Sequence, residues 1–193
     1  MDKLVPRRSA LTLLAALALL AAGCGGSSDD GEETTPPPAV PQAKTEPEWI
    51  RRLVNRFLID MDKNLQVVNS LGTDEIRLFL RTGNEQTIRV LRTRMTDLGK
   101  CSQKLRRVGP PPTPSGPLVR IYTNLGRSCP HYELLAQAVL RSIPLISSRD
   151  GRKAAKGEAE LARAYDPSRQ AARYYGAAVR IIQQNGILNA YEG

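Results

Sequence analysis

The segment LGKCSQKLRRVGPPPTPSGPLVRIYTNLGRSCPHY, residues 98–132, places five prolines and two glycines, at 109–117, between two apolar stripes. The stripes are Leu98, Cys101, Leu105 and Val108 before the prolines, and Leu118, Tyr122, Leu125, Cys129 and Tyr132 after them. Apolar residues three or four apart are typical of a helix, and proline cannot continue a helix interior. The segment therefore predicts two antiparallel helices joined by a stiff loop over 109–117.

Two cysteines occupy equivalent places in this predicted hairpin. Cys101 and Cys129 are equally far from position 115, inside the loop, so they should face each other at the same height on the two helices. In an oxidising compartment such a pair forms a disulfide. The alternative is redox or metal chemistry, but the chain has no Cys-x-x-Cys motif and only His131 lies nearby. We predict a Cys101–Cys129 disulfide and no metal site.

Helical periodicity continues on both sides of the hairpin. Before the hairpin and within it, the predicted helices are 47–71, a short helix from Thr73 through Leu80, 84–108 with Asn84 as its cap, and 117–143. After the hairpin, one helix is opened by Ser148 or Asp150 and runs to Tyr165. The last helix is opened by Asp166-Pro167, runs through Ile182 and is closed by Asn185-Gly186. Pro130 should kink the 117–143 helix or begin a new one, and Pro144 should end it or bend it.

These elements predict the fold class. We expect an all-α, up-and-down bundle of about four long helices with one or two short ones, stapled by one disulfide, on a disordered N-terminal tether. The predicted divisions are 1–23 as a removed signal peptide, 24–47 as a lipidated cysteine and linker, 48–188 as the bundle and 189–193 as a tail.

The N-terminus carries an export signal. Lys3, Arg7 and Arg8 precede an apolar run over 10–22, which is too short to span a bilayer stably. The run ends in LAAGC, residues 20–24, which resembles the lipobox of bacterial lipoproteins, with Ala21 where Leu is commonest. The resemblance implies a mature N-terminus at Cys24 that carries acyl chains such as palmitate and anchors the chain at the extracytoplasmic face of the cell membrane. An ordinary secretory signal cleaved near Ala22 or Gly23 is the alternative.

Residues 25–47 are mainly Gly, Ser, Asp, Glu, Thr and Pro and show no apolar periodicity. Such a composition cannot build a core, so a disordered spacer is expected, with a reach of about 25 Å. Its acidic residues contrast with the rest of the chain, because residues 45–193 hold 24 Lys and Arg against 14 Asp and Glu.

Three basic clusters stand out beyond the spacer: Arg51-Arg52-Arg56, Lys100-Lys104-Arg106-Arg107, and Arg149, Arg152, Lys153 and Lys156. A solvated, arginine-rich surface is the simpler interpretation. The functional one is contact with an anionic lipid or wall polymer, for which we name the last cluster as the candidate. Export removes nucleic acid as a routine partner.

Motifs for catalysis are lacking in the sequence. His131 is the single histidine, and the zincin, deaminase, di-iron, haem, dinucleotide and P-loop patterns are absent. We therefore expect no catalytic residues, no metal and no cofactor. The leading hypothesis is a non-enzymatic envelope protein that binds a partner protein or an anionic envelope component. The alternative is a small-molecule or lipid carrier or sensor, with a pocket left by Pro130 and the small residues of 154–164. An enzyme with an unrecognised site is a third, weaker option.

Overall fold

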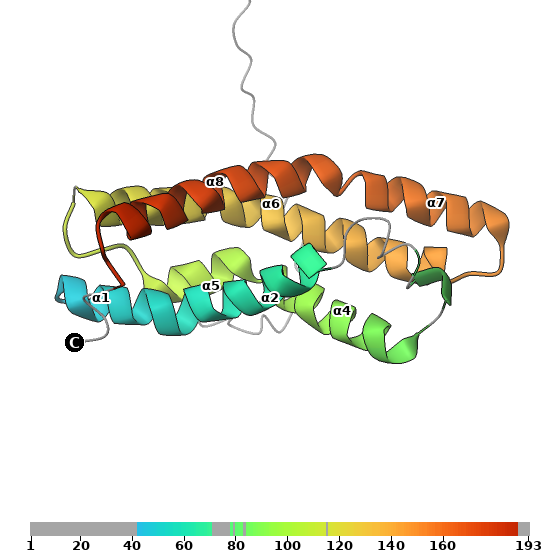
Figure 1. Ribbon diagram of the computed structural model, residues 1–193, viewed down its shortest axis with the longest axis horizontal. Helices are drawn as coiled ribbons and strands as arrows, with labels where there is room; N and C mark the ends of the chain where they lie inside the picture. Colours follow the sequence, from blue (N-terminus) through green and yellow to red (C-terminus); the bar gives the residue numbers. More distant parts are fainter. Residues whose placement is uncertain (1–41, 71–77, 79, 83, 115, 189–193) are drawn as a thin grey trace, which may run out of the picture. The chain divides into compact units, whose positions relative to one another are not determined.

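Figure 1 shows the computed structural model of the chain. It describes residues 42–70, 78, 80–82, 84–114 and 116–188, so Cys24, most of the predicted spacer, the predicted helix start at Thr73 and the 189–193 tail lie outside the described residues. The chain divides into two units, Met1–Pro37 and Pro38–Gly193, and every described residue belongs to the second. The helices are α1 Glu46–Leu53, a π-helical turn η1 Val54–Leu58, α2 Ile59–Ser70, α4 Glu85–Leu98, α5 Cys101–Val108, α6 Pro117–Ile146, α7 Gly151–Ala162 and α8 Tyr165–Gln184.

The predicted all-α bundle is confirmed, and the described residues contain no strand. α1, η1 and α2 run in one direction, α4 and α5 return beside them, α6 runs forward again, and α7 and α8 return along α6 (Figure 1). α6 packs against α4, α5, α7 and α8 and is therefore the central helix. The largest fully buried side chains are Trp49, Leu53, Phe57, Met61, Leu80, Leu91, Met95, Leu98, Val108, Ile121, Leu125 and Ile143.

The first helix begins at Glu46, two residues before the predicted domain start at 48. Thr45 caps it by accepting a hydrogen bond from the Glu48 N–H, and Pro47 sits in the first turn, where no helical N–H partner is needed. The wider turn at 54–58 was not predicted. It brings Val54 and Phe57 into the core together with Leu53.

The prediction of one helix over 84–108 is wrong, because the chain breaks into α4 and α5 at Gly99 and Lys100. Asn84 caps α4 as predicted by accepting from the Thr87 N–H at 3.1 Å. At the break, Gly99 has low helix propensity, and the N–H of Lys100 turns to the Asp97 carbonyl three residues earlier. Two residues later, the backbone N–H of Ser102 donates to the Glu133 side chain of α6 instead of to a helical carbonyl.

The loop after α5 closes the hairpin at the same end of the bundle where α1 begins. Gly109 and Gly116 have φ of 79° and 93°, the left-handed region that glycine adopts without strain. The buried indole N–H of Trp49 donates to the Gly109 carbonyl at 2.9 Å, and Thr113 bonds Glu46. These contacts join the loop to the first turns of α1.

Pro130 does not begin a new helix and Pro144 does not end one, so those two alternatives of the prediction for 117–143 are wrong. α6 continues through both prolines for 30 residues and ends at Ile146. Both proline side chains are exposed. On its solvent side a helix tolerates longer carbonyl hydrogen bonds, so a missing N–H and a proline ring disturb it less there than in the core.

The predicted start of α7 is confirmed, and the predicted start of α8 is corrected. Asp150 caps α7 through the N–H groups of Arg152 and Lys153. α8 begins at Tyr165 rather than after an Asp166 cap, and Pro167 occupies its first turn, where a missing N–H costs nothing. α8 ends as predicted: Gly186 has φ 58°, and Ile187 donates to the Ile182 carbonyl and buries its side chain.

Candidate functional site

The candidate cluster Arg149, Arg152, Lys153 and Lys156, hereafter the turn patch, lies on the α6–α7 connection and the first turns of α7. All four residues are exposed. Among the described residues no carboxylate pairs with them, because Glu158 pairs with Arg81, and Glu160 pairs with Arg141 at 3.2 Å and Arg163 at 2.6 Å.

The position of the turn patch on its helix is electrostatically unfavourable for folding. A helix N-terminus carries partial positive charge, and acidic residues usually occupy the first turn. The first turn of α7 contains no acidic residue and instead carries Arg152 and Lys153. The Asp150 cap supplies one carboxylate at this helix end, and the four cations outnumber it, so folding leaves a net positive charge here. Sites that break a local stability rule are often functional sites.

Each of the other two predicted clusters loses one cation to an ion pair, whereas its remaining members are exposed. Arg52 is held by Glu48 at 2.6 Å and is mostly buried, whereas Arg51 is exposed. The backbone N–H of Lys44 and the Arg52 guanidinium together lower the pKa of Glu48. Lys104 points inward, with 11% of its side chain exposed. Adjacent positions on a helix point about 100° apart, so a run of charges in sequence is divided among faces.

The structure adds a basic surface that our sequence analysis missed, the α4 face, formed by Arg89, Arg92, Arg94 and Lys100. Arg89, Arg92 and Lys100 are exposed and Arg94 is half-buried. None of the four forms an ion pair with a carboxylate in the described part of the chain. These cations are spaced along one helix instead of adjacent in sequence. A count of uncompensated cations on each predicted helix face could have found them.

Three shallow hollows, open to solvent, surround the α4 face. The first, of about 420 Å³, lies between α4 and the end of α6. The second, of about 390 Å³, and the third, of about 290 Å³, lie along α4 itself. The lining residues of the first are Glu85, Ile88, Arg89, Arg92, Pro144 and Ser147; of the second, Arg92, Thr93, Arg94, Thr96, Asp97 and Lys100; of the third, Arg89, Val90, Thr93 and Arg94.

A polar cluster beneath the α4 face fixes α4 against α2. The Asn64 side-chain amide donates to Asp97 at 2.8 Å, and Lys104 bridges Asp97 and Asp60, the latter at 3.0 Å. Partial burial opposes ionisation of Asp97, but the hydrogen bonds from Asn64 and Lys104 outweigh it, so the pKa of Asp97 lies below its usual value. The Asn64 amide oxygen is buried and has no hydrogen-bond partner in the described part of the chain.

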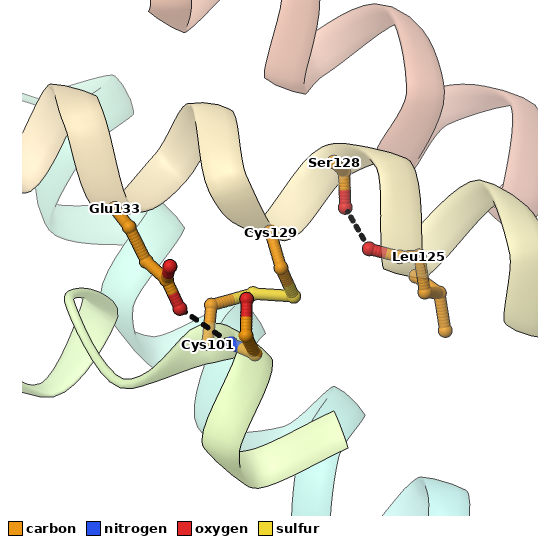
Figure 2. Close-up of a disulfide and its surroundings, with 6 residues drawn as sticks. Cys101, Leu125, Ser128, Cys129 and Glu133 are labelled. Carbon is orange, nitrogen blue, oxygen red and sulfur yellow. Dashed lines mark hydrogen bonds between the residues drawn. A yellow bond between two sulfur atoms is a disulfide. The ribbon is translucent and has the colours of Figure 1, made fainter. Parts of the chain in front are cut away.

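The predicted disulfide joins α5 to α6 (Figure 2). The Cα atoms of Cys101 and Cys129 are 5.1 Å apart, and both side chains are fully buried. Beside it, the Glu133 carboxylate accepts a hydrogen bond from the Ser102 N–H at 2.7 Å (Figure 2). The Lys100 side chain makes no hydrogen bond at the N-terminus of α5, and Glu133 of α6 provides the N-terminal cap instead.

A smaller hollow of about 250 Å³ lies beside the disulfide and is lined by Ser102, Leu105, Arg106, Tyr122, Gly126 and Cys129. Burial raises the pKa of the Tyr122 hydroxyl despite the nearby Arg106. The hollow is slightly below the usual range of ligand pockets, roughly 300–1,000 Å³. Of the small residues that suggested a carrier pocket, Gly157 allows close packing of α7 on α6, because a Cβ at Gly157 would lie 2.7 Å from the Leu145 Cβ.

His131 and its tyrosine neighbours form packing contacts. His131 stacks on Tyr174 with ring centroids 6.0 Å apart, and Tyr132 meets Tyr175 edge to face at 6.1 Å. Burial, with a smaller contribution from Asp62, raises the pKa of Tyr175 to about 12. Among the described residues, no group of three or more His, Cys, Asp or Glu is placed to hold a metal ion. In the same part of the chain, no helix is both long and apolar enough to cross a membrane.

Comparison with known proteins identifies no relative: no family model, curated protein or solved structure matches this chain.

Proposed function

We propose that the chain is a lipid-anchored extracytoplasmic protein whose helical bundle binds an anionic partner without catalysis. The resemblance of residues 20–24 to a lipobox supports the anchor at Cys24. The disulfide supports export, since structural disulfides form and persist mainly in oxidising compartments outside the cytoplasm.

The observation that carries the binding proposal is the turn patch. Four exposed cations without carboxylate partners in the described part of the chain sit at the positive end of a helix. Glu158 and Glu160 pair with other arginines, and Asp150 accepts hydrogen bonds from the backbone N–H groups of α7. An anionic surface or polymer would supply the counter-charge that the fold leaves out. Binding of this kind attracts the partner over about 10 Å at 0.1 M salt and weakens as salt rises.

The binding proposal is tested by neutralising the turn patch in the full chain, as Arg149→Gln, Arg152→Gln, Lys153→Gln and Lys156→Gln together. Co-sedimentation with isolated envelope fragments at low salt should fall about tenfold or more, if each lost pair contributes about 0.2–1 kcal/mol. The matched control replaces Arg51, Lys63, Arg107 and Arg173, four exposed cations on other faces, by Gln. Equal losses in both variants, or no loss in the first, would remove the turn patch as the binding surface.

The anchor is tested separately by mass spectrometry of the mature N-terminus from the native host. The expected product begins at Cys24 and carries the mass of a diacylglyceryl group, and Cys24→Ala releases the protein from the membrane. A mature chain with an unmodified cysteine would instead support the ordinary secretory signal. Native mass spectrometry of the same preparation tests the carrier alternative, which requires a discrete bound small molecule.

A further inference from the structure

The hollows of the α4 face adjoin one another. The first and second share Arg92, the first and third share Arg89, and the second and third share Thr93 and Arg94. The three arginines therefore line neighbouring hollows along α4. With 14 residues, α4 extends about 21 Å.

The first hollow lies close to the start of the turn patch along the chain. It is lined on the α6 side by Pro144 and Ser147, and Arg149, the first residue of the turn patch, lies two positions after Ser147. Arg89 and Arg92 come from a helix about 55 residues earlier in the sequence. The packing of α4 on the end of α6 therefore brings Arg89 and Arg92 to the end of α6 from which the turn patch follows, and we call the α4 face and the turn patch together the basic track.

The side chains of the track fit a flexible anionic polymer better than a bilayer. Arginine offers a planar fork of N–H donors that matches phosphate or carboxylate oxygens. Membrane-binding helices combine such cations with large apolar side chains that enter the lipid. The exposed residues between the α4 cations are Val90, Thr93, Thr96 and Gly99, and Val90 alone among these four is large and apolar.

We infer that the α4 face and the turn patch together bind a linear polyanion, with Arg89, Arg92 and Arg94 contacting its anionic groups from the hollows that they line. This inference rests on the proposed function and extends its binding surface from the turn patch to α4. Asp97, the carboxylate in the second hollow, is already neutralised by Lys104. Glu85 is the carboxylate of the first hollow and opposes binding there.

The test measures binding of fluorescein-labelled linear polyphosphate to the full chain in detergent micelles, by anisotropy at about 50 mM salt. Arg89→Gln, Arg92→Gln and Arg94→Gln together should weaken binding about tenfold and reduce its salt dependence. The matched control, Arg51→Gln with Arg107→Gln and Arg173→Gln, removes the same charge from other faces and should change binding less than twofold. Glu85→Gln should strengthen binding about twofold, a gain that misfolding cannot produce.

The outcomes separate this inference from the proposed function. Loss of polyphosphate binding in the turn-patch variant but not in the α4 variant would overturn the polyanion track and leave the turn patch standing. Unchanged binding in both would overturn both. Equal loss in the α4 variant and its control would show attraction to net charge alone and overturn the inference. Tight binding to vesicles containing anionic phospholipid with none to polyphosphate would assign the surface to a membrane instead. Polyglutamate in place of polyphosphate distinguishes carboxylate from phosphate as the recognised group.

Discussion

The two ends of the bundle are held together by different means. At the end with the 109–116 loop, α5 is joined to α6 by a disulfide, Glu133 caps α5, and the buried Trp49 indole bonds the loop backbone. At the other end, α7 meets α6 through the backbone of Gly157 and the buried Leu161, and the Arg141–Glu160 ion pair adds to this contact. A second ion pair joins Arg81, which precedes α4, to Glu158 of α7.

The difference shows how a small bundle can carry a surface that does not favour folding. The disulfide joins α5 to α6, whereas the largest fully buried side chains are spread over α1, η1, α2, α4, α5 and α6. α4 itself buries Leu91, Met95 and Leu98 on one side and carries the exposed cations of the α4 face on the other. Repulsion among exposed cations is weak compared with a disulfide or a buried aromatic contact, so the disulfide and the shared core offset the charge of the two basic surfaces.

Removal of the disulfide should have the largest effect and should act on the loop end. Cys101→Ala with Cys129→Ala opens a closed loop of 28 residues and should lower the free energy of unfolding by about 3–4 kcal/mol. Urea unfolding followed by circular dichroism measures the loss, and hydrogen exchange should rise in α5 before α7. A loss below about 1 kcal/mol would show that the loop end does not depend on its staple.

Gly157→Ala should have the next largest effect and should act on the α7 end. An added Cβ would lie 2.7 Å from the Leu145 Cβ and 2.8 Å from the Ile146 backbone nitrogen, so α7 must move away from α6. Overpacking of this kind costs about 2–3 kcal/mol. Gly151→Ala is the matched control, because its Cβ would meet nothing within 4 Å, and it should be neutral or stabilising. Equal thermal midpoints in the two variants would contradict close backbone packing at this end.

Trp49→Phe isolates the hydrogen bond of the loop end from its apolar packing. The variant leaves the Gly109 carbonyl without its 2.9 Å partner in a buried position and should cost about 1–2 kcal/mol. The measurement is urea unfolding followed by far-ultraviolet circular dichroism, since the variant lacks the only tryptophan of the chain. Trp49→Leu should cost more, because it also removes the edge-to-face contact with Tyr122.

Asp97→Asn should have the smallest effect, and its effect should depend on pH. The folded protein lowers the pKa of Asp97 from its ordinary 3.8, so its stabilising contribution is complete above that pH and is lost as pH falls through the lower folded value. The variant should be less stable than the wild type by about 1 kcal/mol near neutral pH. The difference should shrink below about pH 4. A pH-independent difference would show that Asp97 acts through shape alone.

Local patterns predicted most of the secondary structure and failed where tertiary contacts compete with them. Asn84, Asp150 and Gly186 act at the helix ends where the sequence indicated them. Pro130 failed as a helix breaker, because its effect depends on whether it faces solvent or the core. The break at Gly99 was missed, since the α5 cap comes from Glu133, 31 residues away.

The candidate site was only partly predictable for a related reason. The turn patch is contiguous in sequence and remains together on the surface. The Lys100–Arg107 cluster is also contiguous, but Lys104 turns inward to two carboxylates that lie 44 and 7 residues away. Arg89 and Arg92 belong with the turn patch only because α4 packs on the end of α6.

The sequence by itself determined the helices, the hairpin around position 115 and the pairing of Cys101 with Cys129, because periodicity and equal distance from a turn are local properties of the chain. Tertiary structure alone decided which cations stay free and which are neutralised, and which helices meet to form one basic track. Charge interactions depend on distance and solvent exposure, and those quantities exist for residues far apart in sequence only after the helices have packed.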